Sequence, residues 1–175
     1  TTTTRIDDGF RELSVLEKIK FNEDFNNENI LIAFNNSFEN DFNRKNINLL
    51  ESEENKFRFI YTYINLNKIS DKINHELINE YSQKLFKTTL YEEKFEKYLK
   101  NDYYDYEIRY NNLDYCFKVN KFKEDVLLID MISREENNCD NNLINYDKAL
   151  VVHQIKLTYE IINNDYIYKS FMIVN

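Results

Sequence analysis

The sequence contains a single glycine, Gly9, and has no proline and no tryptophan. Glycine is the residue that lets a backbone wrap a phosphate, adopt positive φ at low cost, or present a nucleophilic serine on a sharp turn. One glycine cannot supply a GxGxxG fingerprint, a phosphate-binding P-loop or a GxSxG elbow. Dinucleotide-dependent oxidoreductases, P-loop NTPases, typical kinases and α/β-hydrolases are therefore disfavoured. Tight turns are expected to use Asn and Asp instead.

The chain also lacks the basic surplus of a nucleic-acid-binding protein. It has 23 Lys and Arg against 31 Asp and Glu, a net charge of −8, and a pI near 4.9. Because neutralising phosphates provides most of the affinity for nucleic acids, we expect no nucleic-acid partner. The acidic residues are interspersed with lysines, which indicates an ordinary solvated surface. A composition rich in Asn, Lys, Ile, Tyr and Phe but poor in Gly and Pro suggests an AT-rich genome.

Long hydrophobic runs are absent as well. No stretch approaches the roughly 18 apolar residues of a membrane span, and no signal-peptide core is visible. The chain begins TTTTRIDD without an initiating Met. A removed signal or upstream membrane anchor is one interpretation, which favours an exported or extracytoplasmic location over a cytoplasmic one; a trimmed disordered tail is the other. We expect residues 1–175 to form a single domain, with 1–8 disordered or the remnant of a longer N-terminus.

Apolar residues at four-residue spacing predict helices in the N-terminal half, at about 28–43, 70–87 and 89–100. The first has an aromatic face that runs from Ile30 to Phe42. The second is expected to begin at the N-cap residue Ser70. The pattern Thr89-x-x-Glu92 is a capping box, which predicts the start of the third.

Two further segments of this half are predicted as strands. Residues 13–21 alternate apolar and polar side chains, with an interruption at Glu17. In 56–66, Phe57 and Phe59 alternate as in a strand, although the wider apolar set would also suit a helix. The density of β-branched and aromatic residues favours the strand.

The last 75 residues predict an antiparallel meander at about 103–174. Its expected parts are a hairpin of 103–110 and 113–119 about Asn111-Asn112, a strand at 126–132, a polar loop at 134–148, and a hairpin at 151–174 with its turn within 163–165. Helices followed by such a sheet predict an α+β fold with segregated elements. In element order alone, this resembles the periplasmic domains of secretion-system assembly factors, and no residue motif accompanies the resemblance.

The nearest approach to a catalytic signature is HELIN, residues 75–79. In the zinc-protease motif two histidines four residues apart bind the metal, and the glutamate between them acts as base. Here Asn79 replaces the second histidine, and the only other histidine is His153. We therefore predict an ordinary amphipathic helix, with no metal site and no cofactor.

The other reactive side chains give no catalytic pattern. Adjacent carboxylates fall on polar stretches, which is typical of solvated faces, so no catalytic residue is assigned and a non-enzymatic protein is expected. An enzyme would instead show a buried carboxylate beside His153. Cys116 and Cys139 are candidates for a disulfide if the chain is exported, and two free thiols are the alternative.

The 14 tyrosines are the most distinctive positive feature. Tyrosine combines apolar area with a polar tip, which suits an interface, although it can equally fill a core. The candidate interaction surface consists of Tyr103, Tyr104, Tyr106, Tyr110, Tyr115, Tyr159, Tyr166 and Tyr168.

The leading hypothesis is a non-enzymatic interaction or assembly domain that binds another protein, as the soluble part of an exported or membrane-anchored component. One alternative is a small-molecule or lipid binder with a tyrosine-lined pocket between sheet and helices. Another is an acidic intracellular inhibitor of the immunity type.

Overall fold

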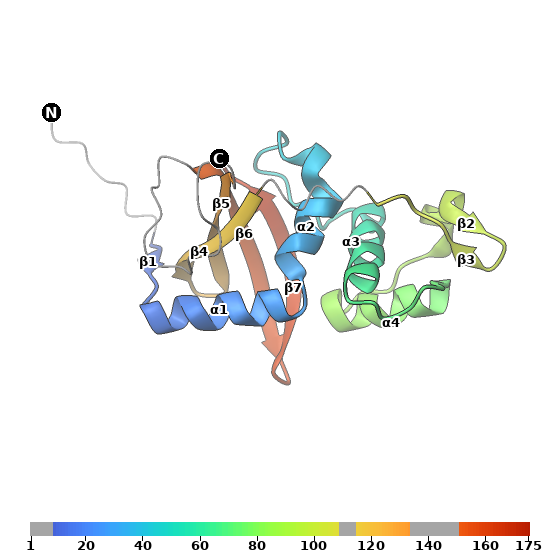
Figure 1. Cartoon of the computed structure of the whole chain (residues 1–175), viewed down its shortest axis with the longest axis horizontal. Coiled ribbons are helices and arrows are strands. Elements are labelled where there is room, and N and C mark those ends of the chain that lie inside the picture. The colour runs from blue at the N-terminus through green and yellow to red at the C-terminus, as the bar shows by residue number, and fades with distance from the viewer. Residues whose placement is uncertain (1–8, 109–114, 134–150) are drawn as a thin grey trace, which may run out of the picture.

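The computed structural model describes residues 9–108, 115–133 and 151–175, and its fold is α+β as predicted (Figure 1). Its helices are α1 (Val15–Asn27), α2 (Ile30–Phe38), α3 (Glu53–Leu66) and α4 (His75–Phe86). The main sheet contains β1 (Arg11–Glu12), β4 (Tyr115–Lys123), β5 (Val126–Ser133), β6 (Val151–Ile162) and β7 (Asp165–Ile173). A second, two-stranded sheet pairs β2 (Leu99–Lys100) with β3 (Tyr103–Tyr104).

The main sheet has the order β1-β4-β5-β6-β7 with antiparallel neighbours, so the predicted meander is confirmed from β4 to β7. The final hairpin is confirmed too. Ile162 pairs with Asp165, and the two residues between them, Asn163 and Asn164, have φ values of 52° and 68°. A two-residue loop with positive φ at both positions is the turn that best matches strand twist, and Asn tolerates it better than most side chains.

The prediction of a strand at 13–21 is wrong, because α1 begins there. Ser14 accepts a hydrogen bond from the Glu17 backbone N–H, and the Glu17 side chain accepts one from the Ser14 backbone. This capping box satisfies two N–H groups that have no partner within the helix. Arg11 also donates to Glu17, and these contacts lower the pKa of Glu17 to about 2. Glu17, which interrupts the strand pattern, is therefore the residue that marks the start of the helix.

The prediction of a strand at 56–66 is also wrong, because these residues form most of α3. The helix lies between two layers. Phe59 stacks on Phe34 of α2 with ring centroids 4.3 Å apart, while Phe57 stacks on Phe95 at 4.5 Å. A helix buried on two sides has apolar residues around most of its circumference, so its sequence shows no single stripe and can mimic the alternation of a strand.

The predicted helix at 70–87 is confirmed as α4, but Asn74 and not Ser70 caps it: Asn74 Oδ1 accepts from Leu77 N at 2.9 Å. The helix predicted at 89–100 is wrong. This segment contains two short 3-10 turns followed by β2. The Thr89 hydroxyl, which would have capped the helix, instead accepts from Gln83 Nε2 at 3.1 Å. We call residues 87–108 the arm.

The hairpin predicted from 103–110 and 113–119 is not formed as expected. Tyr104 pairs with Leu99 in the arm, and Val119 pairs with Ile129 of β5. The proposed turn at 111–112 and the polar loop at 134–148 lie outside the described residues. The two aromatic segments do not pair with each other, because each pairs with a different strand of the fold.

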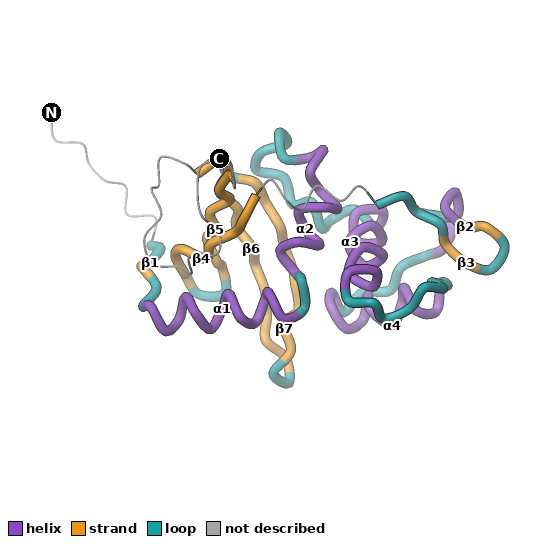
Figure 2. The backbone as a smooth tube through the Cα atoms, in the orientation of Figure 1, coloured by secondary structure: helices purple, strands orange, loops and turns teal. Residues whose placement is uncertain are grey.

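The core is one hydrophobic cluster that extends from Leu13 to Ile173. At its centre Phe34 also stacks on Phe171 of β7, with centroids 4.4 Å apart. Figure 2 shows α1 and α2 beside the main sheet, with α3, α4 and the arm continuing away from it. Phenylalanine rings therefore fill the space between helices and sheet where a tyrosine-lined pocket was considered. Whether the chain is one domain stays a prediction.

Candidate functional site

The HELIN segment forms a closed polar cluster. Asn79 Oδ1 accepts from the Leu90 backbone N–H at 2.8 Å, so its amide nitrogen must face His75 Nε2, 2.9 Å away. The Nε2 atom is then an acceptor, which places the proton on Nδ1, and Nδ1 lies 3.1 Å from the Tyr104 hydroxyl. Each ring nitrogen has an internal partner. Among the described residues, no group of three His, Cys, Asp or Glu side chains is placed to hold a metal.

The eight predicted tyrosines do not lie on one surface. Three of them are buried in the core, at Tyr104, Tyr159 and Tyr168. Of the rest, Tyr103 is 42% exposed, and three are half-buried, at Tyr106, Tyr115 and Tyr166. Tyr110 lies outside the described residues. The core positions follow from ring packing, since a buried aromatic contributes more apolar area than an exposed one. An interaction role stays a prediction for the others.

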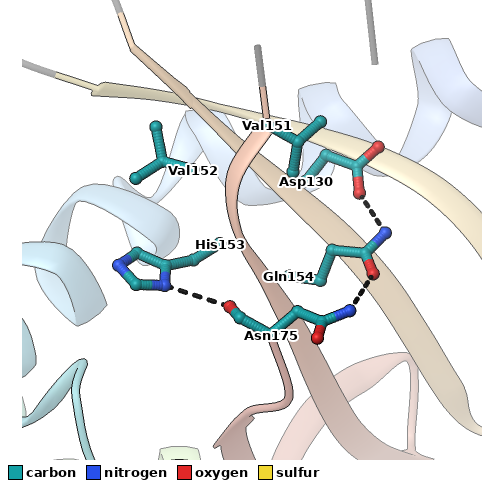
Figure 3. Close-up of a pocket in the computed structure, with 6 residues that line it drawn as sticks. All are labelled: Asp130, Val151, Val152, His153, Gln154 and Asn175. Carbon is teal, nitrogen blue, oxygen red and sulfur yellow. Dashed lines mark hydrogen bonds between the residues drawn. The ribbon is translucent and has the colours of Figure 1, made fainter. Parts of the chain in front are cut away.

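A second polar cluster surrounds Asp130 of β5, whose side chain is 0% exposed (Figure 3). Asn120 Nδ2 donates to Oδ2 and Gln154 Nε2 donates to Oδ1, both at 2.9 Å. A buried carboxylate is tolerated only when hydrogen bonds replace its lost hydration. These bonds join β4, β5 and β6 at one level, so we interpret the cluster as fixing the alignment of the three strands.

Asp130 and His153 line one pocket of about 320 Å³, together with Val151, Val152 and Asn175. They nevertheless belong to opposite faces of the sheet. Asp130 pairs with Gln154 and the next residue, Met131, pairs with His153, so the two side chains point in opposite directions. The His153 ring packs on Phe42, and its Nδ1 lies 3.0 Å from the carbonyl oxygen of Asn175. Figure 3 shows no direct contact between the imidazole and the carboxylate.

The described residues include only one of the two cysteines of the predicted disulfide. Cys116 is half-buried in β4, and no cysteine of the described part of the chain is free. Cys139 lies outside that part, so the pairing of Cys116 with Cys139 stays a prediction.

A third site is a groove of about 440 Å³, which we call the hairpin groove. One wall is a single face of α1, with Lys20, Asp24 and Asn27, and it continues at the C-cap residue Glu28. The second wall is the C-terminal turn of α4, with Lys84 and Leu85. The floor is the β6–β7 hairpin, with Ile161, Asn164, Asp165 and Tyr166. Figure 1 shows the tip of this hairpin projecting beyond both helices.

One hydrogen bond fixes the hairpin to α1. The Tyr166 hydroxyl donates to Asp24 Oδ2 at 2.7 Å, across 142 residues of sequence. The Tyr166 ring packs on Phe25 of the same helix, with centroids 5.3 Å apart. Its cross-strand neighbour Ile161 remains 56% exposed, which leaves an aliphatic side chain at the mouth of a polar groove.

The groove has a negative electrostatic character. Its three carboxylates, on Asp24, Glu28 and Asp165, outnumber the ammonium groups of Lys20 and Lys84. The phenol pKa is raised above its ordinary value in a set of neighbouring tyrosines, at Tyr63, Tyr81, Tyr166 and Tyr168. Burial is the main cause in each, and the negative charge of Asp24 or Glu28 is a further one.

Sequence reasoning identified only one residue of this groove, Tyr166. Lys20, Asp24 and Asn27 of α1 and its C-cap Glu28 have the i, i+4, i+7, i+8 spacing of one helix face, but that signal required the helix to be recognised at 15–27. No local pattern shows that this face lies opposite a hairpin more than a hundred residues later.

Comparison with protein-family models, curated proteins and solved structures finds no match to this chain. None of the described helices combines the length and apolar character needed to cross a bilayer.

Proposed function

We propose that this protein is a non-enzymatic binding domain that engages another protein through the hairpin groove. The observation that carries the proposal is the exposed Ile161 side chain in an open groove whose walls come from α1, α4 and the β6–β7 hairpin. A single exposed aliphatic side chain is common on protein surfaces, so the position of Ile161 in a groove with several convergent polar groups is what supports the proposal.

The polar clusters around His75 and Asp130 have a structural role instead. The groups around His75 are hydrogen-bonded to one another, and the amides of Asn120 and Gln154 bind the carboxylate of Asp130. Both clusters hold elements of the fold together. In the hairpin groove, by contrast, the Glu28 and Lys84 side chains are each about half exposed, and their charged atoms are 3.9 Å apart. Such loosely paired groups are available to a partner at little cost in stability.

The experiment is site-specific photocrosslinking in the source cells. A benzophenone amino acid replaces Ile161 in one variant and Leu16 in the other. Leu16 is a matched control because it is 79% exposed and lies in the first turn of α1, which contributes its later turns to the groove. We expect a discrete crosslinked protein adduct from position 161 and none from position 16.

Equal labelling from the two positions, or no adduct from position 161, would overturn the proposal. Mass spectrometry of the adduct would identify the partner and the residue it places against Ile161.

A further inference from the structure

We infer that the occupant of the hairpin groove is a basic segment of the partner protein, carrying a Lys or Arg side chain next to an aliphatic or aromatic one. This inference rests on the proposed function and names the chemistry of the partner at the same site.

The charge of the groove favours a cationic side chain. Glu28, the C-cap residue of α1, follows Asp24 by four residues, and Asp165 begins β7 in the floor of the groove. A cation in the groove therefore meets carboxylates from both the α1 wall and the floor. The whole chain has a net charge of −8, which would also attract a basic partner during diffusional encounter.

The two lysines of the groove do not cancel this attraction. Lys84 is 3.9 Å from Glu28, and its side chain is 46% exposed, so the ion pair is weak. Lys84 also lies over the Tyr81 ring, with Nζ 5.5 Å from the centroid. Lys20 has no salt bridge within the described residues. Both side chains are long and can move aside for a competing cation.

The apolar part of the site favours a neighbouring hydrophobic residue. Ile161 is exposed beside the buried Leu85 of α4, so a partner side chain placed there would cover aliphatic surface that is now in water. The groove volume of about 440 Å³ falls within the range of roughly 300–1,000 Å³ usual for ligand sites, and it suits two or three side chains rather than a folded domain.

The test uses phage-displayed random peptides selected on the full chain. Binding of the enriched peptides is then measured against the triple variant Asp24→Asn, Glu28→Gln, Asp165→Asn. We expect enriched peptides in which Lys or Arg lies within a few residues of Ile, Leu, Phe or Tyr. Their affinity should fall about tenfold in the triple variant, the effect of three exposed ion pairs, and should weaken with salt.

Two further variants distinguish the effect of the groove carboxylates on peptide affinity from the effect of the net charge of the protein. The control Glu51→Gln, Glu76→Gln, Glu93→Gln removes the same charge from exposed residues that do not line the groove, and it should leave affinity within about twofold. Lys20→Gln with Lys84→Gln should strengthen binding about two- to threefold, because it removes repulsion without altering the carboxylates. A thermal melt of each variant confirms that it is folded.

Enriched peptides without basic residues, an equal loss in the control variant, or no enrichment at all would overturn this inference. If photocrosslinking at position 161 still captures a partner in those cases, the proposed function stands and only the basic chemistry is wrong. If the crosslink is also absent, both fail.

Discussion

The HELIN cluster and the hairpin groove are built from similar side chains, but they use their polar atoms differently. In the first, His75, Asn79 and Tyr104 bind one another, and Asn79 also binds the backbone of Leu90. In the second, Asp24 accepts a hydrogen bond from Tyr166 and Glu28 is loosely paired with Lys84, but these groups also border open space. The histidine-containing cluster drew attention from the sequence because of its residue types. On this comparison, how far the polar atoms bind one another, more than residue type, distinguishes the structural cluster from the proposed binding site.

The largest expected effect concerns the buried phenols, of which Tyr104 belongs to the HELIN cluster. Burial raises the pKa of Tyr159 to about 12, and it also raises the pKa of Tyr63, Tyr104 and Tyr168 above the ordinary value. Since the folded pKa exceeds the unfolded value of about 10, the stabilisation is complete below pH 10 and is lost as pH rises through the folded pKa. A phenol with a folded pKa of about 12, such as Tyr159, would remove roughly 1 kcal/mol at pH 11, and the other three buried phenols add to this loss.

Urea unfolding at a series of alkaline pH values, followed by tyrosinate absorbance, measures this loss. Tyr104→Phe should remove the contribution of the Tyr104 phenol to the loss of stability at alkaline pH. A pH-independent stability between 9 and 11 would contradict the buried placement of these rings.

A smaller loss is expected from opening the closed cluster. Asn79→Ala leaves the Leu90 N–H and His75 Nε2 without their partner, which should lower the free energy of unfolding by about 2 kcal/mol. Asn79→Asp keeps an acceptor for Leu90 and should lose less. Chemical denaturation compares the two variants. An unchanged stability in Asn79→Ala would mean that the cluster is not closed in solution.

The tether of the hairpin should contribute less. Tyr166→Phe removes the hydroxyl that donates to Asp24, in a half-exposed setting, so we expect a loss of about 1 kcal/mol. Asp24→Asn retains an oxygen acceptor and should cost less than that. Hydrogen exchange of the β6–β7 backbone amides would show whether the loss is local. Faster exchange confined to the arm would contradict the assignment.

The smallest effect is expected at the ion pair of the groove. Replacing both Glu28 and Lys84 with Gln should change stability by less than about 0.5 kcal/mol, because the pair is loose and half-exposed. A thermal melt tests this. A large destabilisation would mean that Glu28 and Lys84 stabilise the fold. The hairpin groove would then not differ from the HELIN cluster in this respect.

The sequence predicted part of the fold and little of the site. The aromatic helix predicted at 28–43, which the structure limits to Ile30–Phe38, the helix at 70–87 and the final hairpin were each visible in local spacing. The segment 56–66 was misread because α3 is buried on two sides. The helix predicted at 89–100 is replaced by two short 3-10 turns and β2, and Thr89 contacts Gln83 of α4 instead of capping a helix.

The sequence by itself determined the class of fold, the turns made with Asn in place of glycine, and the exclusion of glycine-dependent catalytic motifs. These properties depend on residue type and on spacing over a few positions. Only the tertiary structure decided which polar groups form hydrogen bonds within the protein and which line a groove. That choice depends on contacts such as the one between Tyr166 and Asp24, 142 residues apart, and local periodicity carries no information about them.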